Sequence, residues 1–476
     1  MRCDNVKADA QPPSQRRRDP EYDIDRRAKL PPGPKGHRLQ NLRRRTTDYT
    51  RFMNVLRGAY GEVVSYDLPF MKCCAIFDAD LIREILVTQQ PFFRPWFPGD
   101  LRDDWKYGSV SLHQGEEQRR RSEFMTSAFA GDSAGAYAEI VAEKALDLRE
   151  ACRPGRALDI VKELELFTWN ALVEIILGRD VEIPRQLGED ILNSEKVYLI
   201  LDILPGAKKL KSLPIPAIRR GRRSVRLLDE AIYGSMQRAR DASYSEDDIV
   251  TKYVRAKDCE GAAGPLENDR AIRDELIILL TGFIDAPTGA LAFGIHHLAR
   301  NPEVRSRLER EVDEVLGHRE IAAKDFDRLP YIRAVLKEVL RLDPPAPILL
   351  PKEAVEDRVV GGHLIPKGTL VHVGMRELHH RAEYWDDAPE FRPERWLENP
   401  PPPRPPCPAH GYIPFGLGPH TCRGIDIAER LFVFGIASLA QQLRLEPESG
   451  AEPQRNNTAV GVTGPWMVNG RRRPGA

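Results

Sequence analysis

Apolar positions recur at helical spacing along most of the chain beyond residue 80, whereas strand-like segments are short and few. Residues 63–66 and 74–77 have the length and the β-branched or aromatic content of strands. Residues 359–373 contain further short strands, interrupted by a glycine pair and by a Pro-Lys-Gly turn. The pattern predicts a mainly α fold with small β-sheets.

Three helices have clear signals. Asn301 followed by Pro302 predicts a helix that Asn301 caps, because Asn favours the cap and proline the first helical position. A second helix should begin at Pro330 and end near Leu342, where an Asp-Pro-Pro sequence stops it. Residues 275–300 are apolar around most of the helix circumference. They predict one central, buried helix about 40 Å long.

The N-terminal segment is polar, charged and aperiodic, so we predict that residues 1–30 form a disordered tail. A proline-rich hinge follows, and no convincing linker divides residues 31–476, which we predict to be one domain. The absence of a signal peptide and of an apolar run of about 18 residues favours a cytoplasmic protein without a transmembrane helix. The basic and apolar segment 208–216 is a candidate for peripheral membrane contact, although an ordinary loop explains it more simply.

Composition narrows the class of protein. The 476 residues are 41% hydrophobic, enough for a sizeable core, and the 71 basic residues balance the 71 acidic ones. A neutral balance gives no argument for a nucleic-acid partner. The seven cysteines are odd in number and scattered, which fits a reducing compartment rather than a disulfide framework.

The decapeptide from Phe415 to Gly424 carries the most specific chemistry. It reads F-x-x-G-x-H-x-C-x-G, with Gly418, His420 and Cys422 inside it and an apolar helix directly after it. Glycines permit a flat ligand to approach the backbone closely. The amides at the start of the helix should favour the thiolate form of the cysteine. Such a loop can present a thiolate to a metal from one side.

Zinc is an alternative for this segment. Cys407, His410, His420 and Cys422 together offer two sulfur and two nitrogen ligands. The His-x-Cys spacing is unusual for zinc, and a zinc site leaves Phe415 and the glycines unexplained. We therefore rank zinc well below a flat metal cofactor.

A second motif lies on the helix that begins at Pro330. Glu338 and Arg341 are three residues apart, share a helix face and can form an ion pair. An exposed pair of this kind contributes under about 1 kcal/mol. A Pro-Glu-Arg segment ending at Arg395 follows the short strands.

The decapeptide resembles the haem-ligand loop of the cytochrome P-450 (haem-thiolate) family, and the other motifs follow the family's order over about residues 31–470. The resemblance implies the single-domain cytochrome P-450 fold, with a long oxygen-binding helix and a cysteine-ligand loop. It implies haem b with Cys422 as the axial ligand. It makes Glu338, Arg341 and Arg395 a structural triad. The loop residues expected at the haem are Phe415, Gly418, His420 and Gly424.

The central helix resembles the family's oxygen-binding helix, usually A/G-G-x-D/E-T, but departs from it. Gly282 and Asp285 keep the small and acidic positions, whereas Ala286 stands where the proton-relaying threonine is usual. At 100° per residue, Thr281 and Thr288 point away from Ala286, and Pro287 can kink the helix. We therefore predict that no protein hydroxyl occupies the relay position, and that protons arrive through water or a substrate hydroxyl.

The remaining site residues follow from the same resemblance. Arg121 is a candidate for a haem propionate, since Ser122 stands at the usual arginine position. Lys352 occupies a position that often holds a propionate-binding arginine and keeps its charge. The expected substrate-pocket residues are Ile348, Leu349 and Val462.

The resemblance implies a monooxygenase that inserts one oxygen atom from O2 into a hydrophobic organic substrate. Electrons would come from an external ferredoxin or reductase, since this chain has no flavin or iron–sulfur motif, and we expect a monomer. Ala286 keeps a second interpretation open, a haem-thiolate peroxygenase or an isomerase or dehydratase. A non-catalytic haem sensor or a zinc-binding module is the alternative from another class.

Overall fold

The structure of the chain is a computed structural model. It describes residues 28–34, 38–96, 109–110, 113–129, 132–155, 157–179, 181–203, 215–241, 247–260, 266–347, 349, 351–399, 403, 407–448, 451–455 and 461–474. Most of the predicted tail (1–27), most of the segment 208–216, and Ile348 lie outside the described residues.

Helices make up most of the described structure, as predicted. The α-helices are α1 (Arg38–Thr47), α2 (Tyr49–Tyr60), α3 (Ala79–Arg83), α5 (Gly115–Phe129), α6 (Asp132–Ala151), α7 (Ile160–Leu177), α8 (Gln186–Ile203), α9 (Pro216–Ala239), α10 (Ile249–Glu260), α11 (Asp269–Gly282), α12 (Asp285–Arg300), α13 (Pro302–Leu316), α14 (Pro330–Leu342), α15 (Met375–His379) and α16 (Ile425–Gln442). Short π or 3₁₀ turns are η3 (Glu84–Thr88), η4 (Gln90–Phe92), η8 (Ala323–Arg328), η9 (Pro393–Leu397) and η10 (Gly418–His420).

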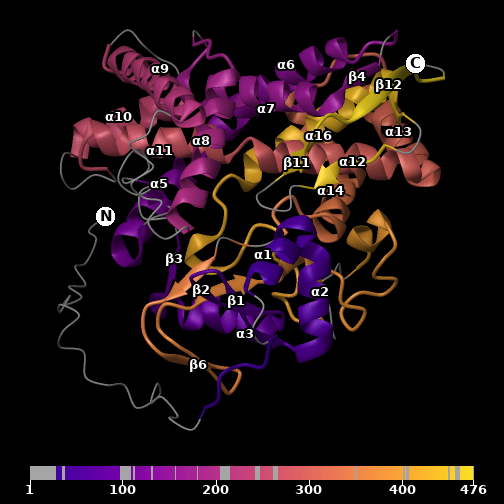
Figure 1. The fold of residues 1–476 in the computed structure, drawn as a ribbon. Helices are drawn as coiled ribbons and strands as arrows, with labels where there is room; N and C mark the ends of the chain where they lie inside the picture. The colour runs from indigo at the N-terminus through magenta and orange to yellow at the C-terminus, as the bar shows by residue number, and fades with distance from the viewer. Residues whose placement is uncertain are drawn as a thin grey trace, which may run out of the picture.

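The strands of the described residues form four small sheets. They are β1 (Val63–Leu68), β2 (Met71–Ile76), β3 (Phe93–Pro95), β4 (Ala157–Asp159), β5 (Lys352–Ala354), β6 (Arg358–Val360), β7 (His363–Ile365), β8 (Leu370–Val373), β9 (Leu443–Pro447), β10 (Gln454–Arg455), β11 (Val462–Thr463) and β12 (Met467–Arg472). The largest sheet has the order β1-β2-β8-β5-β3, in which only β2 and β8 are parallel. This sheet lies with α1, α2 and α3 at one end of the molecule, below most of the other helices (Figure 1).

The main core is built around α12. This helix packs against α7, α14 and α16, and its Leu291 is fully buried with Phe432 of α16 and Leu172 of α7. Gly294 permits this approach, because a Cβ there would lie 2.8 Å from the Phe432 ring. The helices that carry the motifs therefore meet in one core.

The predicted helix boundaries are largely confirmed. α14 begins at Pro330 and ends at Leu342, and α13 begins at Pro302. Asn301 is the N-cap residue of α13 as predicted, but its side chain donates to the carbonyl of His297 and makes no capping hydrogen bond with α13. The residue joins two helices by closing the end of α12.

The central helix is interrupted, which corrects the prediction of one continuous helix. α11 ends at Gly282 and α12 starts at Asp285, with Phe283 and Ile284 in a bend between them. Residue 287 is proline, so the Phe283 carbonyl has no backbone N–H four residues later, and the proline ring crowds that carbonyl. The break lies where the family motif places its oxygen site.

Two observations concern the N-terminal end of the described chain and its most apolar stretch. Lys29 pairs with His363 as an isolated bridge, so the chain already contacts the β-rich end at residue 29. The stretch Asp269–Arg300 is the one part of the described chain long and apolar enough to cross a membrane, because it contains an 18-residue apolar window with a mean hydropathy of 1.8. Since 72% of that apolar window is buried inside the molecule, a core helix explains it.

Candidate functional site

The loop that carries Cys422 is held by its own backbone. The Cys422 N–H donates to the Phe415 carbonyl at 2.9 Å, and the Gly424 N–H points at the Cys422 sulfur at 3.4 Å. The turn η10 closes the loop between them. These bonds fix the direction of the sulfur before any ligand binds.

Gly418 is required by this geometry for two reasons. Its φ of +78° belongs to the left-handed region, and a Cβ there would lie 2.4 Å from the Leu86 carbonyl oxygen. A glycine at this position therefore allows η10 to pack closely against the backbone of η3. Gly418 is absent from the described residues that line the cavity.

A cavity of about 320 Å³ lies against the Cys422 loop. Its lining comes from the loop, from both sides of the α11–α12 break, and from α7, α14 and α16. The described lining residues are Leu86, Leu172, Gly282, Phe283, Ala286, Pro287, Ala290, Leu336, Leu340, Pro345, Ala346, Leu349, Lys352, Pro414, Phe415, Gly416, Leu417, His420, Cys422, Gly424, Ile427, Ala428 and Leu431. The predicted residues Phe415, His420, Gly424, Lys352 and Gly282 therefore meet around Cys422.

The pKa of the Cys422 thiol corrects one prediction. Burial raises the pKa of this thiol above its usual value, and the Gly424 N–H and the Arg423 charge oppose the increase only in part. The helix start favours the thiolate as expected, but burial outweighs it. A metal cation at the sulfur would remove the proton outright.

Lys352 is a buried cation on the wall of the cavity. It is 6% exposed, and none of the described residues forms an ion pair or a hydrogen bond with its ammonium group. Burial lowers its pKa to about 8. A buried charge without a partner is unfavourable, so this position is suited to an anionic ligand group.

His420 lies next to this cation. Burial, and then the charges of Lys352 and Arg423, lower the pKa of His420 to about 3, so the imidazole is neutral. Its Nε2 lies 3.4 Å from the Gln90 side-chain nitrogen. A neutral imidazole and a cation thus face the same cavity.

Arg121 is placed differently from the prediction. It is buried in ion pairs with Glu117 and with Glu267, the latter at 2.9 Å, and it does not line the cavity. Its neighbour Gln118 was missed as a functional residue. Gln118 donates to the Pro419 carbonyl and so ties α5 to the cysteine loop.

The α11–α12 junction presents small side chains to the cavity. Ala286 and Ala290 line it, and no described lining residue carries a hydroxyl group. The Thr281 hydroxyl donates to the Ile277 carbonyl at 2.8 Å, and the Thr288 hydroxyl is buried away from the cavity. These positions leave no hydroxyl on the described part of the cavity wall beside Ala286.

Other residues of this junction depart from expectation. Asp285 does not line the cavity, and its carbonyl is approached by Gly461, where a Cβ would lie only 2.7 Å away. Gly289 packs on the Gly461 backbone, where a Cβ would lie 3.1 Å from the Gly461 Cα. Phe283, which motif reasoning missed, lines the cavity, and a Cβ on Gly424 would lie 2.8 Å from its ring.

The expected substrate residues are only partly brought together. Leu349 lines the cavity. Val462 does not, and it packs against the main core. Ile348 lies outside the described residues.

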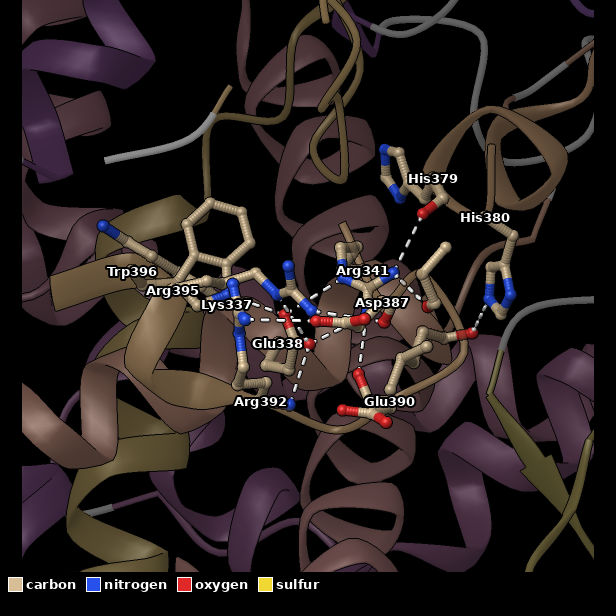
Figure 2. A network of polar contacts seen from close by, with 12 residues as sticks. Lys337, Glu338, Arg341, His379, His380, Asp387, Glu390, Arg392, Arg395 and Trp396 are labelled. Carbon is tan, nitrogen blue, oxygen red and sulfur yellow. Dashed lines mark hydrogen bonds and ion pairs between the residues drawn. The ribbon is translucent and has the colours of Figure 1, made fainter. Parts of the chain in front are cut away.

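Glu338, Arg341 and Arg395 form the predicted triad (Figure 2). Arg341 donates to both Glu338 oxygens, at 3.0 and 2.8 Å, and Arg395 donates to one of them at 3.1 Å. The Trp396 indole N–H donates to Glu338 at 2.9 Å, and the Arg392 backbone N–H at 3.1 Å. Both carboxylate oxygens therefore have at least two donors.

The triad also binds backbone. Arg341 donates to the carbonyls of His379, Ala388 and Glu390, which joins α14 to α15 and to the segment before η9. Burial alone would raise the pKa of the Glu338 carboxyl, but the bonds from Arg341 and the charges of Arg341 and Arg395 hold it below its usual value. The network is structural, because none of its members lines the cavity.

The zinc alternative is not supported. His410 pairs with Asp80 at 2.9 Å instead of turning to Cys422. Within the described residues, no three His, Cys, Asp or Glu side chains gather as a metal site. A site with Cys422 as the one protein ligand agrees better with these positions.

The residues present fit a haem. The cavity offers one sulfur ligand, apolar walls and glycines whose missing side chains leave room for a flat ring. Lys352 supplies a buried cation for a propionate carboxylate, and His420 a neutral imidazole that can donate to one. When bound, a thiolate-ligated haem activates dioxygen by donating electron density towards it.

Comparison with known proteins identifies the family of this chain. The cytochrome P-450 family model matches residues 31–465. Cyclooctat-9-en-7-ol 5-monooxygenase of Streptomyces melanosporofaciens is 26% identical over 404 residues, 82% of this chain and 84% of that protein. Steroid 17-alpha-hydroxylase/17,20 lyase of Bison bison is 27% identical over 451 residues, 89% of this chain and 87% of that protein. With the family model covering most of its length, the chain belongs to the cytochrome P-450 family and is a haem-dependent oxidoreductase.

Proposed function

We propose that the substrate is a hydrophobic organic molecule into which one oxygen atom of O2 is inserted. The observation that carries this proposal is the apolar wall around the Cys422 sulfur, to which Leu86, Leu336, Leu340 and Leu431 contribute. Apolar walls with few polar groups favour apolar ligands. The relatives named for a steroid and for cyclooctat-9-en-7-ol support this class, because both compounds are mostly hydrocarbon.

The chain's own residues have distinct tasks in this proposal. Cys422 would hold the haem iron, Lys352 and His420 would bind the propionates, and the Glu338 network would stabilise the surrounding fold. Ala286 and Ala290 leave space above the ring for O2 and substrate.

The test uses haem-loaded protein, O2 and a surrogate ferredoxin with its reductase. With hydrophobic alcohols and sterols as probes, we expect a hydroxylated product that contains one atom of ¹⁸O when ¹⁸O2 is supplied. Product that takes its oxygen from water, or no product with any probe while electrons are consumed, would contradict the proposal.

A second candidate is a peroxide-dependent reaction of the same site. The observation that favours it is that Ala286, and no described hydroxyl, faces the cavity. Parallel reactions with hydrogen peroxide and without electron donors separate the two. Turnover by peroxide alone, with none from O2 and electrons, would establish the second candidate in place of the first.

We infer that the electron donor is a separate, acidic protein that binds beside Arg423. A surface hollow of about 690 Å³ lies there, next to the cysteine loop, lined by Gln118, Arg119, Glu123, Pro419 and Arg423 among others. Arg119 is paired with Glu123 at 2.7 Å, so the proposed contact rests on Arg423. An acidic donor predicts that Arg423→Glu slows reduction and that salt weakens the wild-type rate. Equal reduction rates in both proteins at low salt would contradict this docking site.

A further inference from the structure

A buried polar cluster surrounds Glu275 in the first half of α11. Glu275 is 1% exposed. Its Oε2 accepts from the Val110 N–H at 2.8 Å, whereas its Oε1 is buried and has no hydrogen-bond partner among the described residues. An unsatisfied carboxyl oxygen in the interior needs an explanation, since such groups are normally paired or hydrated.

Two further hydroxyl groups at this place share the same property. Tyr253 of α10 is 2% exposed and Ser109 is fully buried, and neither hydroxyl has a partner within the described part of the chain. Ser109 directly precedes Val110, and the charge of Glu275 affects the Tyr253 hydroxyl. Three unsatisfied polar groups of this kind are the usual partners of an internal water, which takes about three hydrogen bonds.

Burial keeps the Glu275 carboxyl partly protonated near neutral pH, so that it can both give and take up a proton. Burial raises the pKa of the carboxyl to about 7, and Asp274 on the same helix adds to this. The Val110 N–H and Arg121 of α5 oppose it. The Arg121 charge is shared with Glu117 and Glu267, which limits its effect.

Glu275 lies on the face of α11 that leads to the cavity. Gly282 is seven residues later, about 20° around the helix and about 10.5 Å along it. Gly282 lines the cavity, and a Cβ there would meet nothing within 4 Å. Leu279 lies between the two on this face, so a proton would have to pass beside it along water.

We propose that Glu275 is the acid that delivers protons to the oxygen site, through water bound by its free oxygen and by the hydroxyls of Tyr253 and Ser109. The proposal rests on the proposed function. Insertion of one oxygen atom from O2 into a C–H bond consumes two protons and two electrons and releases one water. The electrons come from the separate donor, and Glu275 is reprotonated from solvent after each transfer. It would replace the hydroxyl that is missing at Ala286.

The alternative role is a structural anchor for Val110. Glu275→Gln separates the two roles, because a glutamine oxygen still accepts the Val110 hydrogen bond but the amide does not titrate. Glu377→Gln is the matched control. Glu377 is also buried, has no partner for either oxygen among the described residues and has its pKa raised by burial to about 7, but it lies on α15 and not on the helix that leads to the cavity.

The first measurement is infrared titration of haem-loaded protein, which needs neither substrate nor turnover. We expect carboxyl C=O bands that disappear near pH 7, one of them lost in Glu275→Gln and another in Glu377→Gln. If Glu275→Gln removes no such band, Glu275 holds no exchangeable proton and the proposal is overturned.

The second measurement is the fraction of electrons recovered as product instead of hydrogen peroxide. We expect Glu275→Gln to lower this fraction by about ten-fold, less than the roughly 100-fold or more that a general acid in direct contact contributes, since water intervenes. Tyr253→Phe, which keeps the packing, should lower the same fraction by a smaller factor. Hydrogen peroxide brings its own protons, so peroxide-driven turnover should hardly change, and Glu377→Gln should resemble wild type.

Unchanged coupling in both Glu275→Gln and Tyr253→Phe would overturn the proposal. A loss in Glu275→Gln that is equal with O2 and with peroxide would show the structural anchor instead. If wild type forms no product from O2, the proposed function fails and proton delivery fails with it, while the infrared band would still identify Glu275 as a protonated acid.

Discussion

Two buried polar groups of this molecule are satisfied to very different degrees. Around Glu338, each carboxylate oxygen accepts at least two hydrogen bonds, and Arg341 reaches three backbone carbonyls (Figure 2). Around Glu275, one carboxyl oxygen and the Tyr253 hydroxyl have no partner in the described chain. The first group fixes a shape, and the second leaves polar atoms available to a ligand.

The difference between the Glu338 network and the Glu275 cluster follows from the task we propose for each. A fully satisfied network in a low-dielectric interior is rigid, and breaking it exposes a buried charge. That rigidity suits the segments that hold the cysteine loop. Proton transfer needs groups that change partners, and unsatisfied buried groups that persist in a fold are associated with function.

The largest effect on product formation should come from replacing Cys422. Cys422→Ala removes the only sulfur that lines the cavity among the described residues, so the red-shifted thiolate band of the reduced, carbon monoxide-bound protein should vanish along with product formation. Cys407→Ala is the control, since Cys407 is buried elsewhere and its thiol pKa is raised by burial to about 11. A thiolate band that survives in Cys422→Ala would assign the ligand to another residue.

Breaking the satisfied network should affect stability rather than chemistry. Arg341→Met leaves the Glu338 charge buried with fewer partners, and the free energy of unfolding should fall by about 3–5 kcal/mol. Arg307→Met removes an exposed pair with Glu394 at 3.1 Å and should change stability by less than about 1 kcal/mol. Urea unfolding of the three proteins checks this. Equal losses in both variants would mean that the triad is no stronger than a surface pair.

The same contrast explains what the sequence could predict. The triad follows from spacing on one helix plus one later arginine, and α14 begins and ends where proline and an Asp-Pro-Pro sequence place it. The cysteine loop was found because glycines and one thiolate ligand are local requirements. Such features depend on a few neighbouring residues, so their positions along the chain suffice.

The cluster at Glu275 and the break at Phe283 could not be found in this way. Glu275 is distinguished by what surrounds it, and Ser109 and Tyr253 come from distant parts of the chain. Arg121 was expected at a propionate, but Glu267, 146 residues later, binds it instead. Pro287 signalled a kink, yet only the packing shows that the bend turns Phe283 towards the cavity.

Lys352 is an intermediate case, a buried charge for which we propose the cofactor as the partner. Lys352→Met should weaken haem retention about ten-fold, corresponding to about 1.4 kcal/mol. Lys352→Arg should preserve most of it, and Lys367→Met, at an exposed lysine, should have no effect. Haem transfer to apomyoglobin measures this, and equal transfer rates for Lys352→Met and wild type would exclude the propionate role.

The haem-free protein offers a pH test of the same residue. Burial lowers the Lys352 pKa from 10.5 to about 8, so between these values the unfolded chain binds a proton that the folded chain has lost. The free energy of unfolding should therefore gain a rising contribution from about pH 8 to 10.5. Lys352→Met should lack that contribution, and identical pH profiles would show that the ammonium is not buried in solution.

The smallest effect, and the sharpest test of the comparison, concerns Ala286. Ala286→Thr places a hydroxyl on the helix face that lines the cavity, and it should raise the fraction of electrons recovered as product by about two-fold, the size of one weak hydrogen bond. Ala286→Val has the same shape without the hydroxyl and should not. If Glu275 delivers protons, the gain should be larger in Glu275→Gln, because the new hydroxyl then replaces the missing donor. Equal effects of Thr and Val would mean that residue 286 acts only through the volume of its side chain. A gain of the same size in wild type and in Glu275→Gln would mean that the two positions act independently.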